Sequence, residues 1–317
     1  SRIKVMAKMD IAEHMAPQDG RIGITFEYFL RYETNKITSA PEYLYPYSTG
    51  ANGNMPNMNF AELKAWGWDL TVNHRNTIGK LKYNASLTLT DHEDEYIDFG
   101  DESAQLPNLR RVGTSSLVFV PTLYEAAGLF QTQEEIDSWP LDQDGQGNAT
   151  LGPGDIKYVD QNGDHVLDEQ DKLYIKNSSY PDMDVAVRLG VSYKGFFVNA
   201  MFQGEIGYKQ NLTERYTLEN GAMQKYQDYH LTDTWSESNP DARYPRLKIA
   251  SSNDNNRKPS TFWVRNCNFL RLKLVNLGYQ FPTSLVKKAH LSTASIAFQA
   301  SNVVSWTDLK EMDPESL

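Results

Sequence analysis

Apolar and polar side chains alternate along much of this chain. Between residues 81 and 90, one face carries Leu, Tyr, Ala, Leu and Leu, while the other carries Lys, Asn, Ser, Thr and Thr. Successive side chains of a β-strand point to opposite faces, so a strict period of two has no helical interpretation. The alternation recurs at 22–32 and at 185–193. The sequence therefore predicts an all-β, antiparallel fold.

Short connections join the predicted strands into hairpins. Lys194-Gly195 separates two alternating runs, and glycine there supplies the positive φ that a two-residue hairpin can require. Two further turns span residues 76–79 and 282–291. The strands that these turns join are 68–75 with 80–90, 185–193 with 196–202, and 270–281 with 295–302.

Long polar segments separate the hairpins, at 36–62, 91–182 and 205–260. Short turns at one end of a sheet and long loops at the other are typical of outer-membrane β-barrels. A soluble β-sandwich also has an apolar and a polar face, so alternation alone does not separate the two folds. Aromatic residues near strand ends suit either a lipid–water boundary or the rim of a soluble core. They are Trp66, Trp68, Tyr193, Phe196, Trp263, Tyr279, Phe281 and Trp306.

Composition narrows the function classes. The formal net charge of −10 argues against a nucleic-acid-binding protein, which would carry a basic stripe. No run of about 18 apolar residues is present, so no transmembrane helix is predicted. A mean hydropathy of −0.57 is still compatible with a barrel, because each barrel strand needs only about 10 alternating residues. Neither a starting Met nor a signal peptide opens the sequence, so we expect a piece of a longer protein.

One segment, 160–171, has the spacing of a calcium-binding loop. In the EF-hand pattern, oxygen ligands fall at positions 1, 3, 5, 7, 9 and 12 of a 12-residue loop. Closely spaced carboxylates suit Ca²⁺ because the cation relieves their mutual repulsion. The predicted ligands are Asp160, Asn162, Asp164, the Val166 carbonyl, Asp168 and Asp171.

Two departures from the EF-hand pattern weaken this prediction. His165 stands where glycine permits the sharp turn, and Asp171 is shorter than the usual bidentate Glu. The affinity should then be that of extracellular modules, about 10⁻⁴–10⁻³ M. The alternative is a solvated acidic turn with side chains bonded to its own backbone. In either case the expected role is structural, ordering a long loop.

No catalytic motif stands out, and we predict that the chain is not an enzyme. It contains no Gly-x-Ser-x-Gly elbow, no phosphate-binding glycine loop and no His-Glu-x-x-His. Paired carboxylates could hydrolyse glycosides, but nothing in the sequence fixes their separation. The acidic run 91–98 is interpreted as solvated, and Glu134-Glu135 as part of a short helix.

A series of short segments follows one order between residues 64 and 317. They are AWGWDL at 65–70, IGKLKY at 78–83, GLFQTQEEI at 128–136, GDIKYVDQNGD at 154–164, YKGF at 193–196, FQG at 202–204, FLRLK at 269–273, LGYQFP at 277–282, QASN at 299–302 and DPE at 313–315. In this order they resemble the C-terminal barrel portion of the SusC/RagA family, TonB-linked (TonB-dependent) outer-membrane transporters.

This resemblance implies a fold and an orientation. Residues 1–317 would form the C-terminal strands of a large, plugged, antiparallel transmembrane β-barrel of about 22 strands. The plug and the N-terminal strands would lie outside this chain. The short turns would be periplasmic, and 91–182 would be a long extracellular loop containing the EF-hand-like segment.

The resemblance also implies a function and partners. The protein would be an active transporter of the cell outer membrane that imports glycans or peptides. Its partners would be a SusD-like surface lipoprotein, the TonB-ExbB-ExbD complex, outer-membrane lipid and an oligosaccharide or peptide substrate, with no nucleic acid. The Ca²⁺ predicted separately from the spacing of 160–171 would be a structural cofactor bound in the loop. The alternative from another class is a secreted or surface-anchored β-sandwich binding module stabilised by calcium.

Overall fold

A computed structural model of the chain shows the predicted all-β architecture. It describes residues 2–14, 21–39, 48, 50, 56–100, 106–117, 122–174, 179–213, 228–248 and 254–316. Within these residues, no helix is both long enough and apolar enough to cross a membrane.

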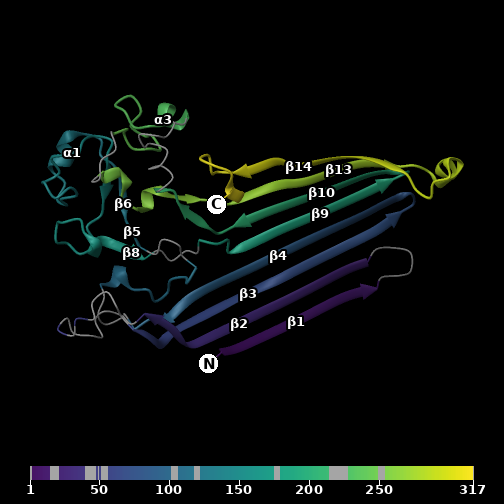
Figure 1. The fold of residues 1–317 in the computed structure, drawn as a ribbon, viewed down its shortest axis with the longest axis horizontal. Coiled ribbons are helices and arrows are strands. Elements are labelled where there is room, and N and C mark those ends of the chain that lie inside the picture. The colour runs from purple at the N-terminus through teal and green to yellow at the C-terminus, as the bar shows by residue number, and fades with distance from the viewer. Residues whose placement is uncertain are drawn as a thin grey trace.

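Eight strands form one large antiparallel sheet in which neighbours in sequence are neighbours in space (Figure 1). The strands are β1 (Arg2–His14), β2 (Arg21–Ser39), β3 (Asn57–Ile78), β4 (Leu81–Asp98), β9 (Met183–Tyr193), β10 (Phe196–Ile206), β13 (Phe269–Gln280) and β14 (Ser295–Thr307). The prediction of a mainly antiparallel β fold is confirmed.

The short turns lie together at one end of the sheet. Lys194 and Gly195 both have positive φ, 50° and 93°, between the paired residues Tyr193 and Phe196. Positive φ at both central residues is the type I′ geometry whose twist matches that of paired strands. The turn between β3 and β4 is shorter than predicted, because pairing continues to Ile78 opposite Leu81.

The boundary of the long loop at residue 91 is wrong. β4 continues to Asp98, and β3 already begins at Asn57, inside the predicted loop 36–62. Backbone ladder bonds form regardless of side-chain polarity, so an acidic run can remain in a strand. The extension also buries its own apolar cluster of Leu63, Tyr96 and Phe99.

The remaining elements are short and belong mostly to the connections between the long strands. Three pairs make two-stranded sheets: β5 (Thr122–Tyr124) with β8 (Lys172–Tyr174), β6 (Ala126–Leu129) with β7 (Ile156–Tyr158), and β11 (Lys209–Asn211) with β12 (Val264–Asn266). The helices are α1 (Gln133–Asp137), α3 (Asp228–Thr232) and α4 (Thr283–Val286). The 3-10 turns are η3 (Pro107–Leu109), η4 (Glu169–Asp171), η5 (Asn255–Arg257), η6 (Thr261–Trp263), η7 (Lys287–Ala289) and η8 (Pro314–Ser316). The helix predicted around Glu134-Glu135 is therefore confirmed as α1.

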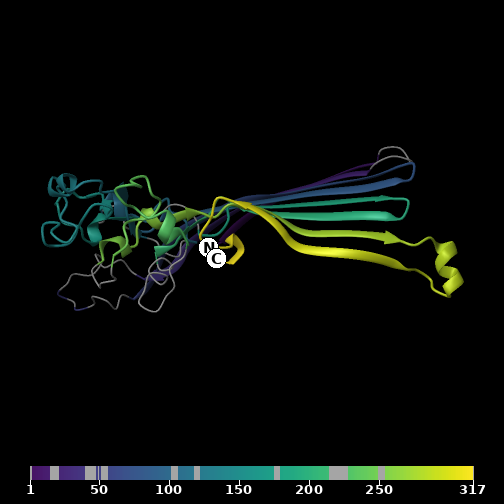
Figure 2. The same ribbon diagram turned by 90° about the horizontal axis from the view of Figure 1, so that it is seen from above.

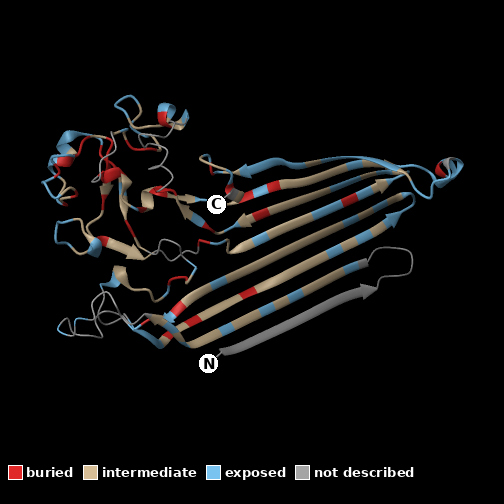
Figure 3. Ribbon diagram, in the orientation of Figure 1, coloured by how far each residue is buried: buried red, intermediate tan, exposed pale blue. Residues whose placement is uncertain are grey.

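The main packed core lies in the connections rather than under the sheet. Buried residues concentrate where 122–174, 228–248 and 254–266 meet, which we term the loop assembly (Figure 3). Its centre includes Tyr158 and Trp263. A β-sandwich would need a second large sheet against the first, and the described residues contain only the three small pairs besides the eight-stranded sheet.

Candidate functional site: a loop assembly above a two-faced sheet

The outer face of the sheet is apolar and uncovered. Val191, Val198, Leu277 and Phe298 are cross-strand partners in one row across β9, β10, β13 and β14. Their exposed fractions range from 43% to 67%. Leu189 and Trp306 extend the same exposed surface. Contiguous apolar surface of this kind is rare on soluble monomers and marks a membrane or protein contact.

Aromatic rings collect on this face at the short-turn end. The ring centroids of Phe196 and Tyr279 are 4.7 Å apart, and those of Tyr279 and Phe281 are 5.3 Å apart. Tyr193 is exposed beside them. Such rings suit a lipid–water boundary. Trp263 differs from the sequence interpretation, because it is buried in the loop assembly and donates through Nε1 to the Asn256 carbonyl.

The inner face is polar, and a segment following β14 is bound to it. Arg271 is buried; its guanidinium donates to Ser305 Oγ and to Asp313 Oδ1, each at 2.5 Å, and also contacts Glu315. Lys273 donates to both carboxylate oxygens of Glu315, at 2.5 and 2.7 Å. These bonds fix the DPE segment against the inner face at the end where the long loops begin.

A cavity of about 950 Å³ lies where the inner face meets the connections. Asp184, Glu205 and Lys273 line it from the sheet, and Tyr208 and Glu315 line it from the connecting segments. Its volume falls at the upper end of the range typical of ligand sites. Its walls carry both charged and apolar groups, so they suit a ligand that can form hydrogen bonds and also has apolar parts.

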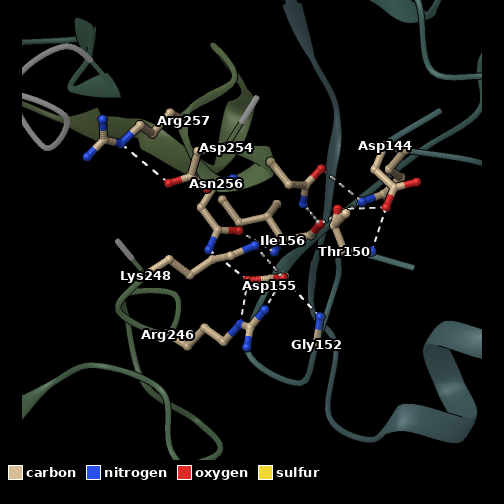
Figure 4. Close-up of polar contacts among 12 residues, drawn as sticks. Asp144, Thr150, Gly152, Asp155, Ile156, Arg246, Lys248, Asp254, Asn256 and Arg257 are labelled. Atoms are coloured by element: carbon tan, nitrogen blue, oxygen red, sulfur yellow. Dashed lines mark hydrogen bonds and ion pairs between the residues drawn. The ribbon is translucent and has the colours of Figure 1, made fainter. Parts of the chain in front are cut away.

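The loop assembly is centred on a buried ion cluster (Figure 4). Asp155 is fully buried and accepts two bonds from Arg246, Nε to Oδ1 at 2.7 Å and Nη2 to Oδ2 at 2.8 Å. Lys248 Nζ is 3.0 Å from Oδ2, and Asn256 Nδ2 donates to Oδ1 at 2.9 Å. Because these partners are about a hundred residues later in the chain, the cluster ties the β4–β9 connection to the β10–β13 connection.

The groups around Asp155 favour its carboxylate form. Burial alone raises the pKa of this group, but the hydrogen bond and charge of Arg246 and the charge of Lys248 outweigh burial, so the pKa lies below its ordinary value. The sequence analysis missed Arg246, Lys248 and Asn256. Of this cluster, only Asp155 was noted in the sequence, as part of the GDIKYVDQNGD segment that resembles the SusC/RagA family.

Glycine is required close to this cluster. Gly154 has φ +89°, and a Cβ there would lie 2.4 Å from the Trp235 ring. That distance is far below van der Waals contact, so the ring packs directly on the backbone.

The predicted calcium ligands lie in one tight turn, bonded to its backbone. Asp160 accepts from the Gly163 amide at 2.6 Å and from the His165 amide at 2.9 Å. Asp164 accepts from the Val166 amide at 2.9 Å. His165 adopts φ 66°, the left-handed conformation that glycine normally supplies at this position. The same arrangement continues with Asn162 accepting from the Asp164 amide and Asp168 from the Gln170 amide.

Asp171 closes the turn. Its carboxylate accepts from the Gln161 and Asp168 amides, both at 2.9 Å, and forms a capping box with Asp168 at η4. Burial, and then the negative charges of Asp160 and Asp164, raise the pKa of Asp171. Within the described residues, no three His, Cys, Asp or Glu side chains are grouped closely enough to hold a metal ion. The turn therefore has a left-handed residue at the sixth position of the predicted calcium loop, but its carboxylates are not gathered into a cage.

The comparisons with known proteins agree on one kind of protein. No family model matches the chain. TonB-dependent receptor P26 of Formosa agariphila is 26% identical over 320 residues, which is 97% of this chain and 30% of that receptor. TonB-dependent receptor SusC of Bacteroides thetaiotaomicron is 23% identical over 279 residues, or 83% of this chain and 24% of SusC. All of these relatives are named as receptors and none as an enzyme.

A solved structure shares the fold. A chain of the structure described as the RagAB peptide transporter superposes with a TM-score of 0.64 and 21% identity, over 99% of this chain and 33% of that chain. By fold class, then, this is part of a large antiparallel β-barrel with long connections at one end. In sequence and fold the chain is similar to SusC/RagA-type TonB-dependent receptors, and it spans about a third of the length of the relatives it matches.

Proposed function

We propose that the chain forms wall strands and outer loops of a TonB-linked importer in the outer membrane. The observation that carries this proposal is the two-faced sheet: an exposed apolar row from Val191 to Phe298 outside, and buried ion pairs around Arg271 inside. A lipid-facing apolar surface opposite a polar interior is the arrangement that a transmembrane barrel requires. The likeness to TonB-dependent receptors supports the same assignment.

The partners follow from this role. A SusD-like surface lipoprotein would contact the loop assembly, which stands at the end of the sheet opposite the short turns (Figure 1). The TonB-ExbB-ExbD complex would supply energy from the inner membrane. The substrate would be an oligosaccharide or a peptide, and the cavity beside Glu205 and Lys273 has the polarity and size to hold part of either.

Cell fractionation of the source organism tests the proposal. We expect the full-length protein in the outer-membrane fraction, soluble only in detergent, and co-purifying with a lipoprotein. Denaturing the purified complex should release an oligosaccharide or peptide that mass spectrometry can identify. Recovery as a detergent-independent soluble protein would instead support a secreted binding module.

We also propose that the turn at 160–171 binds Ca²⁺ weakly and thereby orders the loop. Support comes from the left-handed His165 and from the buried carboxylate of Asp171, which faces the negative charges of Asp160 and Asp164. A cation bound there would relieve that repulsion. Small movements of the carboxylates would have to complete the cage.

Calcium-dependent hydrogen exchange measures this directly. In the full-length protein, about 10 mM CaCl₂, tenfold or more above the expected dissociation constant, should slow amide exchange across 160–171 several-fold. The double variant D160N/D164N should lose that response. D241N removes an exposed carboxylate elsewhere in the loop assembly and should keep it. If calcium does not change the exchange rates in the unmodified protein, the calcium proposal is wrong and the segment is a solvated acidic turn.

A further inference from the structure

Charge is distributed unevenly along the sheet. The whole chain has 41 acidic against 31 basic residues. Yet the three segments 70–90, 185–204 and 269–307, which contain the short-turn halves of the hairpins, have no Asp or Glu at all. Their charged side chains are all Lys or Arg. In these three hairpins the acidic residues lie at the end that carries the long connections, whereas the β1–β2 hairpin differs, because Glu13 pairs with Ile22 next to its turn.

Four lysines mark the short-turn end. Lys80 lies in the β3–β4 turn, Lys194 in the β9–β10 turn, and Lys287 and Lys288 in the β13–β14 connection. We call these four residues the basic rim. All four are exposed, and none forms an ion pair within the described residues. The ammonium of Lys194 lies 5.1 Å from the centroid of the Tyr193 ring, which places it over the outer, aromatic face.

Apolar side chains accompany the basic rim. The β13–β14 connection folds into α4 and η7, which project past the other short turns (Figure 2). Val286 is buried and anchors this connection, whereas Leu285 is 60% exposed and Leu291 52% exposed. They continue the exposed apolar surface that ends at Phe281. Exposed leucines beside lysines are typical of segments that lie in a membrane interface.

We propose that the basic rim binds anionic phospholipid headgroups at the periplasmic surface of the outer membrane. The inference rests on the proposed function, which places the short turns on that side. Lysine stems can lie along apolar surface while their ammonium groups reach phosphates. Each Lys near an anionic membrane surface strengthens association about fivefold, so the rim as a whole gives a substantial preference for anionic lipid.

The geometry favours a membrane over a protein or small ligand. The four lysines lie in three successive hairpins, along the line of short turns at one end of the sheet. The aromatic rings of Tyr193, Phe196 and Tyr279 lie directly adjacent to this line. The cavity suited to a ligand lies at the other end of the sheet.

The test uses the full-length protein, purified in neutral detergent and titrated with phosphatidylglycerol or phosphatidylcholine under native mass spectrometry. We expect K287Q/K288Q to weaken phosphatidylglycerol binding about tenfold or more, and to leave phosphatidylcholine binding unchanged. The control K209Q/K310Q removes the same charge from exposed lysines at the loop end and should bind both lipids normally. Added salt should reduce the difference in phosphatidylglycerol binding between the rim variant and the control, because salt screens charge.

Three results would overturn the proposal. Equal phosphatidylglycerol binding by the rim and control variants would show that the charge of the basic rim does not contribute to lipid binding. An equal loss for both lipids would mean general loss of apolar contact. A rim variant that keeps phosphatidylglycerol but loses a periplasmic protein on purification would assign the surface to that protein. Failure of the proposed function would appear separately, as absence of the unmodified protein from the outer-membrane fraction.

Discussion

Asp155→Asn is expected to loosen the loop assembly by about 3 kcal/mol, because it leaves Arg246 and Lys248 without their buried anion. This is the lower end of the cost of breaking a buried ion pair, since the Arg246 side chain remains 31% exposed and can regain water. The Ile156 amide, which donates to Asn256 Oδ1, reports on the change. Its hydrogen exchange in the full-length protein should accelerate about 100-fold.

Asp137→Asn is the matched control, since Asp137 is an exposed carboxylate on α1 in the same assembly. It should leave exchange at Ile156 unchanged.

The contribution of Asp155 to the stability of the loop assembly depends on pH in a definite direction. The folded-state pKa of Asp155 is lowered, so its contribution is complete above the ordinary value of about 3.9 and is lost as the pH falls through the folded value. The exchange rates of Ile156 in the unmodified protein and in Asp155→Asn should therefore become equal only in acid. Equal exchange rates at neutral pH would contradict the proposed role of the cluster.

Leu189→Arg is expected to destabilise the barrel by about 2–4 kcal/mol, because it places a charge on the lipid-facing side midway along β9. The measurement is the temperature at which the full-length protein loses its compact, heat-modifiable form on a denaturing gel. We expect a clear fall in that temperature, together with less protein in the outer-membrane fraction.

The comparison variant is Gln299→Arg, on the inner face of β14 opposite Asn276. An arginine of similar length there faces the polar interior, so the transition temperature should hardly move. If both variants behave alike, the outer face does not contact lipid and the barrel interpretation fails. A soluble module would accept Leu189→Arg readily, because a charge on an exposed surface has little cost in water.

The extents of the strands show one limit of sequence-based prediction. The run from Asp91 to Asp98 contains five acidic residues, and no apolar pattern marks it as a strand, so the sequence predicts a loop there. Ladder bonds to β3 and burial of Tyr96 against Leu63 hold it in the sheet. Those contacts join residues 23 to 36 positions apart in the sequence, and local pattern does not encode them.

The calcium turn shows a different limit. Spacing alone identified Asp160, Asn162 and Asp164, and the structure places them in a single turn with backbone bonds. Whether carboxylates gather around an ion depends on distances of a few tenths of an ångström, which spacing does not fix. Calcium-dependent hydrogen exchange across 160–171 therefore tests whether the turn binds Ca²⁺.

The sequence by itself determined the antiparallel sheet, its two faces and the Lys194-Gly195 hairpin, because a period of two and a turn with positive φ are local properties. Tertiary structure alone decided how the connections pack. Asp155 meets Arg246, Lys248 and Asn256, and Arg271 meets Asp313 and Glu315, only after distant segments have folded together. Buried charges demand partners, but which residues provide them depends on the path of the whole chain.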